Sequence, residues 1–192
     1  MLTIRDAIPE DAALIRALIQ ELAEYDGEAD HVRTTEVDIA LDGFGTKAKF
    51  RTIIADWGSQ AAGFALFFHY YSTWRGSGIY LEDLYVRPEF RRRGIGTALL
   101  AEVAQTAQKE SCTFVRWAVL DWNEPALNMY ASLGAGVLNN WRCVVLDGDR
   151  LAKLAREGAR SSPSAIGYGA HPGWPTEGST VACVASKTEG VG

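Results

Sequence analysis

The sequence predicts an α/β fold that combines an antiparallel pair of strands with a strand–turn–helix unit. Two β-rich runs, 50–56 and 61–71, are separated by four residues, a spacing typical of a β-hairpin. A third β-rich run, 79–86, leads through a basic, glycine-containing turn into a helical pattern at 94–109. The combination of an antiparallel hairpin with a strand–turn–helix unit indicates this fold class.

The segments before the hairpin predict a short strand, a helix and an acidic loop. Thr3–Arg5 fits a first strand, and Pro9 at a first helical position, followed by two acidic residues, marks a helix start. Residues 21–30 hold five acidic residues and no Lys or Arg, which indicates a solvated loop. The predicted helix has one apolar face, made by Leu14, Ile15, Leu18, Ile19 and Leu22.

The segments after position 109 predict two further strands and two helices. Residues 114–120 are β-rich, and a short helical pattern at 124–133 stops at Gly134. Residues 142–146 are expected to form a last strand and residues 147–156 a closing helix. These segments complete the expected domain.

Length and composition predict one folded domain with an extension. The chain has 192 residues, 47% of them apolar, and after Gly158 Gly, Ser, Pro, Ala and Thr dominate. We therefore expect a domain at 1–157 and a flexible tail at 158–192. No chemistry is assigned to the tail.

Charge, cysteine content and hydropathy exclude several classes of protein. The net charge of -5 has the wrong sign for a general binder of nucleic acid or of an anionic membrane. Three cysteines without C-x-x-C spacing argue against a disulfide framework or a structural zinc site, and no metal is predicted. The longest apolar stretch, 61–68, is too short to span a bilayer, and the N-terminus lacks the pattern of a signal peptide. We expect a protein of the reducing cytoplasm.

The sharpest motif is the turn between the 79–86 strand and the 94–109 helix, which fits R-x-x-G-x-G. We call Arg91–Thr97 the glycine turn. Its glycines let the backbone approach a ligand closely, and the helix N-terminus offers unpaired N–H groups to an anion. The window Arg87–Arg93 holds four arginines against one glutamate on a chain of net negative charge. A pyrophosphate is the natural ligand for such a turn.

Two other interpretations of this motif were weighed. A glycine pair can simply tighten a strand-to-helix turn. A dinucleotide-binding motif needs a third glycine where Leu99 stands, and a P-loop needs G-K-[ST] at the end of the turn; the sequence has neither. The arginine-led version of the motif is that of enzymes using acyl-CoA.

With this motif the chain resembles the GNAT superfamily of acetyl-CoA-dependent N-acetyltransferases, whose signature is [RQ]-x-x-G-x-[GA]. The resemblance extends over roughly residues 3–156 and implies the GNAT acyl-CoA N-acyltransferase fold. In that fold helices flank a mixed, largely antiparallel sheet, which is split between its fourth and fifth strands. Four further segments look like the diamine acetyltransferase branch: Glu21–Tyr25, Asp42–Gly45, Tyr80–Asp83 and Trp122–Pro125.

Within that branch two segments point in different directions. Tyr71–Trp74 and Ala118–Trp122 resemble the thialysine N-acetyltransferase type more than the spermidine/spermine type. The spermidine/spermine enzymes have Asp-Pro where this chain has Ser72–Thr73, so one carboxylate partner for a cation is missing. Asn123–Pro125, in contrast, has the sequence found at this motif in the polyamine type.

The resemblance implies direct acetyl transfer with two catalytic residues. A primary amine is neutral in only ~1 of 2,500 molecules at pH 7, so a base or a desolvating pocket must assist. Glu82 matches the family's proposed base, acting through water, and the alternative is an ordinary solvated strand residue. Tyr130 matches the general acid that protonates the departing CoA thiolate, and the alternative is a half-buried core tyrosine.

The resemblance also implies a binding surface for acetyl-CoA. The backbone of Leu84 and Val86 is expected to pair with the pantetheine amides, and Asn123 to contact the pantetheine arm or to fix the helix at 124–133. The full predicted set is Leu84, Tyr85, Val86, Arg91, Arg92, Arg93, Gly94, Ile95, Gly96, Thr97 and Asn123.

Aromatic and acidic residues are the candidates for the amine pocket, because they suit a cation. Asp83 is expected on the opposite face of its strand from Glu82, since side chains alternate, and there to serve a second subunit or a second amine. His31 and His69 match no catalytic position. The predicted substrate set is Tyr25, Asp26, Glu28, Trp74, Glu82 and Asp83.

The predicted function is the transfer of an acetyl group from acetyl-CoA to a primary amine of a small cationic substrate, thialysine/lysine-like or a diamine. The alternatives are a spermidine/spermine acetyltransferase and a non-catalytic acyl-CoA-binding sensor. The resemblance implies a homodimer, whereas the cysteines indicate the cytoplasm, and the net charge and hydropathy exclude nucleic acid and membrane as partners. The physiological amine, the pathway and the role of the tail stay open at this stage.

Overall fold

The computed structural model describes residues 1–161, so nearly all of the predicted tail at 158–192 lies outside the described residues. A first compact unit comprises Met1–Gly136, and a second begins at Val137. The first unit holds the sheet and every residue predicted for the site. The division into 1–157 and 158–192 remains a prediction.

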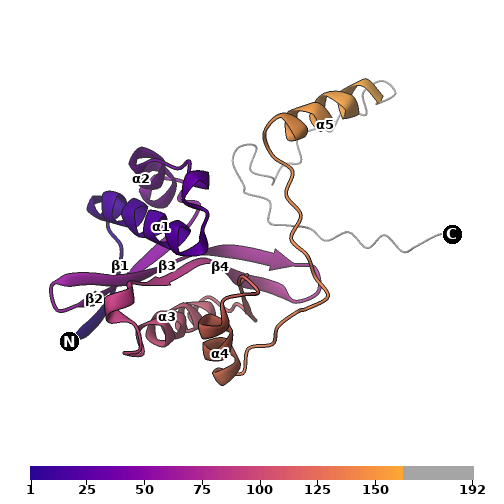
Figure 1. Cartoon of the computed structure of the whole chain (residues 1–192). Helices are drawn as coiled ribbons and strands as arrows, with labels where there is room; N and C mark the ends of the chain where they lie inside the picture. The colour runs from indigo at the N-terminus through magenta and orange to yellow at the C-terminus, as the bar shows by residue number, and fades with distance from the viewer. Residues whose placement is uncertain (162–192) are drawn as a thin grey trace. The chain divides into compact units, whose positions relative to one another are not determined.

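The first unit is built on a five-stranded sheet in the order β1-β2-β3-β4-β5. Figure 1 labels β1 to β4 of this sheet. Strands β1 to β4 pair antiparallel in sequence order, and β5 pairs parallel to β4. The predicted mixed, largely antiparallel sheet is therefore confirmed. The strands are β1 Leu2–Asp6, β2 Arg51–Trp57, β3 Gln60–Ser72, β4 Gly76–Val86 and β5 Val115–Arg116.

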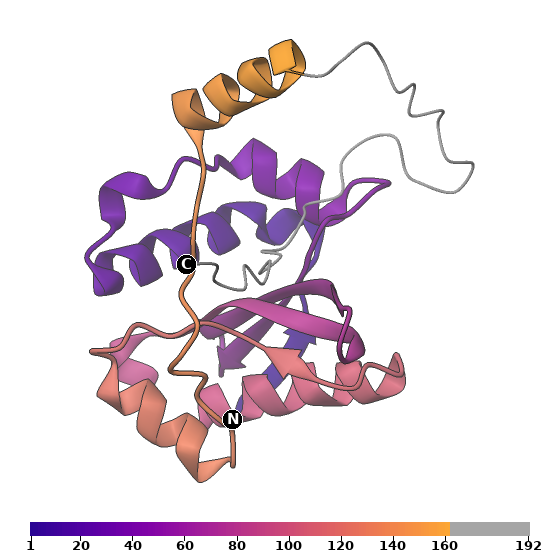
Figure 2. The same cartoon turned by 90° about the vertical axis from the view of Figure 1, so that its right-hand side faces the viewer.

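Helices cover both faces of this sheet. Figures 1 and 2 show α1 and α2 on one face and α3 and α4 on the other. Short 3-10 turns precede α1, follow it and precede the glycine turn. The helical elements of the first unit are η1 Pro9–Asp11, α1 Ala12–Asp26, η2 Ala29–His31, α2 Glu36–Phe44, η3 Pro88–Phe90, α3 Ile95–Lys109 and α4 Glu124–Ser132.

A hydrophobic core lies on each face of the sheet. On the α1 face, Leu18 packs with Phe64, Leu66 and Tyr85. On the α3 face, the buried side chains of the helix pack against alternate residues of the central strands, because strand side chains point to the two faces in turn. The members of that core include Phe67, Ile79, Leu81, Leu99, Val103 and Tyr130.

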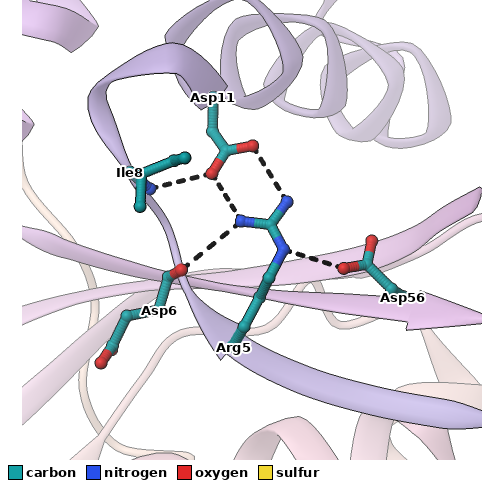
Figure 3. Close-up of polar contacts among 5 residues, drawn as sticks. All are labelled: Arg5, Asp6, Ile8, Asp11 and Asp56. Carbon is teal, nitrogen blue, oxygen red and sulfur yellow. Dashed lines mark hydrogen bonds and ion pairs between the residues drawn. The ribbon is translucent and has the colours of Figure 1, made fainter. Parts of the chain in front are cut away.

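The start of the chain is held to the sheet by ion pairs around Arg5, drawn in Figure 3. Its guanidinium donates to both oxygens of Asp11, at 2.6 and 3.0 Å, and to Asp56 Oδ2 at 2.8 Å. Asp11 also accepts from the Ile8 N–H at 2.8 Å. We call Arg5, Asp11 and Asp56 the Arg5 network; it joins β1 to β2 and to the start of α1.

The N-terminal half contains two departures from the predicted elements. Helix α1 continues to Asp26, so the first part of the predicted acidic loop is helical, and it ends where Gly27 adopts φ 78°. Helix α2 was not predicted, although its start carries a sequence signal. Thr35 accepts from the Asp38 N–H, and Asp38 accepts from the Thr35 N–H, which is a reciprocal cap.

Two predicted strands near the end of the domain are also corrected. The strand expected at 114–120 is limited to Val115–Arg116, and residues 141–147 have no regular structure where a strand was expected at 142–146. Val144 and Val145 are 79% and 76% exposed, so their β propensity has no ladder or packed surface to act through. A helix is present where one was expected at 147–156, as α5 Gly148–Ser161. It belongs to the second unit, so it does not close the domain that contains the sheet.

Candidate active site

The sheet opens between β4 and β5. The two strands pair only at Ile79↔Val115 and Tyr80↔Arg116. From Leu81 to Val86, β4 therefore has no strand partner on its β5 side among residues 1–161. Such an edge presents backbone N–H and C=O groups that an extended, amide-bearing ligand can pair with.

A β-bulge lies where this gap begins, and it corrects the prediction for Asp83. Leu81 is paired with Phe67 and Asp83 with the adjacent Leu66, so Glu82 is an extra residue in β4. A bulge interrupts the alternation of side chains. Asp83 lies on the same face of the sheet as Leu66, which is the α1 face. Leu81 lies on the α3 face, so Glu82, the next residue, also lies on the α1 face. The two carboxylates are neighbours, not on opposite faces.

Three carboxylates form an unpaired group beside the gap, and we call Asp26, Glu82 and Asp83 the acid cluster. Burial, then the charge of Glu82 and then that of Asp26, raise the pKa of Asp83 to about 7. The pKa of Asp26 is raised by burial and by the charge of Glu28. The pKa of Glu82 is raised because the surrounding protein removes part of the solvation of its carboxylate, although the side chain as a whole remains exposed. None of the three forms an ion pair within residues 1–161, whereas Glu28 pairs with His31.

Tyr25, at the end of α1, contacts three residues around the site: Arg91, Trp122 and Asn123. Its ring lies 4.5 Å from the Arg91 guanidinium carbon and 5.7 Å from the Trp122 ring. Its hydroxyl donates to Asn123 Oδ1 at 3.5 Å. The same oxygen caps α4 by accepting from the Ala126 N–H at 3.3 Å, so of the two roles predicted for Asn123 the structure shows that it fixes the helix.

The glycine turn has the backbone shape of an anion site. Arg92 at φ 61° and Gly94 at φ 76° both adopt left-handed conformations, with Arg91 at φ -64° before them. Alternation of this kind turns successive N–H groups toward one concavity, directly before the N-terminus of α3. Gly96 serves packing as well, because an added Cβ would lie 3.3 Å from Met129 Sδ.

Arg91 does not extend from the turn toward solvent. Its Nε donates to the Val86 carbonyl at 2.9 Å, and its guanidinium lies over the rings of Tyr25 and Tyr85. The side chain therefore fixes the end of β4 against α1. In this conformation the backbone of the turn, rather than Arg91, is what faces an anion.

The other arginines of the basic window Arg87–Arg93 divide into a paired and an exposed set. Arg87 donates to Glu21, with its closest distance 2.6 Å, so its charge is compensated. Arg93 lies 5.0 Å from the Trp57 ring and stays exposed, as does Arg92. The charge left near the turn is therefore smaller than the sequence window suggested.

Tyr130 lies on the opposite face of the sheet from the acid cluster. It is 7% exposed, belongs to the core on the α3 face, and its ring meets Trp117 edge-on at 5.0 Å. Burial raises the pKa of its phenol, so it stays protonated at neutral pH. A donor on one face and carboxylates on the other thus flank the open edge of β4.

The remaining predicted residues occupy different positions. Trp74, at the tip of the β3–β4 hairpin, is 70% exposed. Ile95 is buried, so only its backbone is available to a ligand, while Thr97 is exposed in the first turn of α3. A separate cavity of about 190 Å³ near Glu110, at the far end of α3, is lined by none of these residues.

The open sheet edge, the glycine turn and the flanking carboxylates and phenol define an acyltransferase. The chain belongs to the acetyltransferase (GNAT) family, whose model matches residues 15–135. It is 39% identical over 163 residues to the thialysine N-epsilon-acetyltransferase of Bos taurus, covering 79% of this chain and 96% of that one. It is 32% identical to the Homo sapiens spermidine/spermine N(1)-acetyltransferase-like protein 1, covering 80% of this chain and 24% of that longer protein.

A solved structure supports the same fold. The aminoglycoside N-acetyltransferase AAC(6')-Iy in complex with CoA superposes with a TM-score of 0.61 at 19% identity, covering 77% of this chain and 95% of that chain. Within residues 1–161 no helix is both long and apolar enough to cross a membrane. This chain is an acetyltransferase with the GNAT fold.

Two residues near the site were not predicted. Trp117 supports the Tyr130 ring, and Arg116 is the last residue of β5 to pair with β4. The sequence held one signal for Arg116, a single charge inside the apolar run 114–120. Nothing in the sequence indicated the bulge at Glu82.

Proposed function

We propose that this chain transfers the acetyl group of acetyl-CoA directly to a primary amine of a small cationic substrate of the thialysine or lysine type. The observation that carries the proposal is the acid cluster, three carboxylates without cationic partners among residues 1–161. Asp26 and Asp83 are partly buried, and carboxylates in such positions are costly without a cation unless a ligand balances them. A cationic amine does so at the place where the sheet opens.

The chain's own groups fit acetyl-CoA. The unpaired edge of β4 suits the pantetheine amides, and the glycine turn suits the pyrophosphate. When bound, acetyl-CoA supplies an activated acetyl thioester. Leu84 and Val86 are the residues proposed to align it, and Arg92 and Arg93 the exposed cations beside its phosphates.

Glu82 is the proposed base and Asp83 its partner in holding the amine. The raised pKa values of both carboxylates bring them nearer to neutral pH, where a base works best. Removing the proton from the amine creates the nucleophile. Tyr130, which is protonated and lies on the opposite face of the sheet, donates to the departing sulfur.

A polyamine substrate is the second candidate. Asn123–Pro125 has the polyamine-type spelling, and three negative charges suit a chain of several ammonium groups. Against it, Ser72 and Thr73 at the hairpin tip add no carboxylate. Lysine-like amines are therefore the first choice.

A cytoplasmic homodimer is also proposed, without nucleic acid or membrane as a partner. The resemblance to diamine acetyltransferases and the net charge of -5 support it. Size-exclusion chromatography with light scattering checks the oligomeric state. A mass corresponding to one chain at micromolar concentration would contradict the dimer.

The test of function is acetyl-CoA-dependent thiol release with thialysine, lysine, putrescine, spermidine and spermine. We expect turnover concentrated on thialysine or lysine in the full-length protein and its loss in Tyr130→Phe. Preference for spermidine supports the polyamine alternative. Acetyl-CoA binding without turnover of any amine supports a sensor.

A further inference from the structure

An aromatic surface continues from the acid cluster along the α1 face of the sheet. Tyr80, on β4, stacks on Phe68 with ring centroids 5.4 Å apart and lies 6.0 Å from Tyr70. The register places Phe68 opposite Tyr80 and Leu66 opposite Asp83, so these side chains share one face. Aromatic faces accept methylene chains and cations. We call Phe68, Tyr70 and Tyr80 the aromatic surface.

Arg116 borders this surface on its β5 side. It is the register partner of Tyr80, and partners across a sheet lie on the same face. Phe114, two residues earlier, meets Tyr70 edge-on at 5.8 Å, which confirms that this face of β5 adjoins the aromatic surface. Val115, between them, packs into the core on the α3 face. Arg116 therefore faces the acceptor side of the gap.

The charge of Arg116 has no partner in the described part of the chain. Its side chain is partly buried, yet it takes part in no ion pair, hydrogen bond or ring contact within residues 1–161. A partly buried arginine gains most from a bidentate anion such as a carboxylate.

We propose that Arg116 binds the carboxylate of an ω-amino acid acceptor and selects it over diamines. The inference rests on the proposed function, because the acid cluster must hold the reacting amine. About 7–10 Å of strand separates Asp83 from Tyr80, a length that an extended four-methylene chain spans. The acceptor then lies along the aromatic surface, amine toward Asp83 and carboxylate toward Arg116. A diamine brings a second ammonium to Arg116 and is repelled.

The test compares two substrates that differ only in the carboxylate. L-lysine and 1,5-diaminopentane carry the same reacting aminopentyl chain. In the full-length enzyme we expect a higher kcat/KM for lysine. Arg116→Gln should raise the KM for lysine about 10- to 100-fold, with kcat changed little, because a charge-assisted bidentate contact is lost. The kcat/KM for 1,5-diaminopentane should stay unchanged or rise.

Matched variants separate recognition from folding. Lys47→Gln removes one positive charge from an exposed position outside the site and should leave the substrate preference unchanged. Arg116→Lys keeps the charge and should recover part of the preference for lysine. Lysine methyl ester, offered to the unaltered enzyme, should behave like the diamine and requires no substitution.

The outcomes distinguish this inference from the proposed function. An unaltered enzyme that acetylates neither amine overturns both. An enzyme that acetylates lysine and its methyl ester equally well, or an Arg116→Gln variant with an unchanged ratio of the two kcat/KM values, overturns the role of Arg116 alone. Collapse of that ratio in Arg116→Gln, but not in Lys47→Gln, supports it.

Discussion

The Arg5 network and the acid cluster place carboxylates in opposite electrostatic environments within one folded unit. In the Arg5 network the guanidinium of Arg5 holds the pKa of Asp11 below its usual range. In the acid cluster, burial and neighbouring negative charge raise the pKa of Asp83 to about 7. Both groups border the same sheet, but only the first contains a cation.

The difference shows which carboxylates stabilise the folded state and which are available to bind a cationic ligand. The Arg5 network satisfies its own charges, so it favours the folded state. The acid cluster carries charge that the described residues leave uncompensated, and it lies where the sheet opens. Stability and activity should therefore respond to different substitutions.

The largest expected effect is on activity alone. Tyr130→Phe should lower kcat about 10²- to 10³-fold with little change in KM, because a proton donor acts mainly in the transition state. Steady-state thiol release with lysine measures it. Thermal unfolding should be almost unchanged, since the ring and its contact with Trp117 remain. An unaltered kcat removes Tyr130 from the mechanism.

The next prediction concerns the free energy of unfolding and not the activity. Arg5→Ala leaves Asp11, whose side chain is 11% exposed, without its cation, and should cost about 2–3 kcal/mol of unfolding free energy. Because the pKa of Asp11 is lowered on folding, its contribution is present above about pH 4 and is lost as the pH falls. Urea unfolding at pH 7 and pH 3 should show the cost shrinking in acid. The folded fraction should keep its kcat.

Asp83→Asn should move stability in the opposite direction. The pKa of Asp83 is raised on folding, so its ionised form destabilises the fold as pH rises from about 4 to above 7. The variant should be more stable than the unaltered chain at pH 8, by up to about 4 kcal/mol from this change in pKa, and almost equally stable at pH 4. It should also raise the KM for the amine. A loss of stability at pH 8 would show that Asp83 has a structural partner.

The smallest expected effect tests whether the two acidic partners of Arg5 contribute separately to the free energy of unfolding. Asp56→Asn removes one of the two acidic partners of Arg5 and leaves the two-bond pair with Asp11. Because Arg5 is partly exposed, the cost should be about 0.5–1 kcal/mol. Urea unfolding of single and double variants measures the coupling. A cost equal to that of Arg5→Ala would mean that the network acts as one unit.

Local patterns predicted much of the fold. The hairpin, the 79–86 strand, the glycine turn and the helix after it follow from periodicity and turn residues, and all are present. The strand expected at 142–146 failed because β propensity depends on a neighbouring strand. Helix α2 was missed despite its cap at Thr35–Asp38. The acidic loop was misjudged because α1 continues to Asp26 and ends only at Gly27.

The site was predicted by residue type better than by geometry. Asp26, Glu82 and Asp83 were all named, but their proximity depends on register, which a sequence pattern does not fix. The arginines of the turn were predicted as one basic patch, yet Arg87 is neutralised by Glu21. Pairings between residues 66 positions apart are decided by the tertiary fold.

Because β4 contains an extra residue, the geometry of the site depends on the length of this strand as well as on its side chains. A bulge bends its strand and increases its twist, and in this chain the gap from β5 begins at the same point. One inserted residue thus accounts for both the adjacent carboxylates and the opening beside them. Substitution scans, which preserve chain length, leave that cause in place. Deleting a single residue at position 82 is the change that would straighten the strand and restore alternation there.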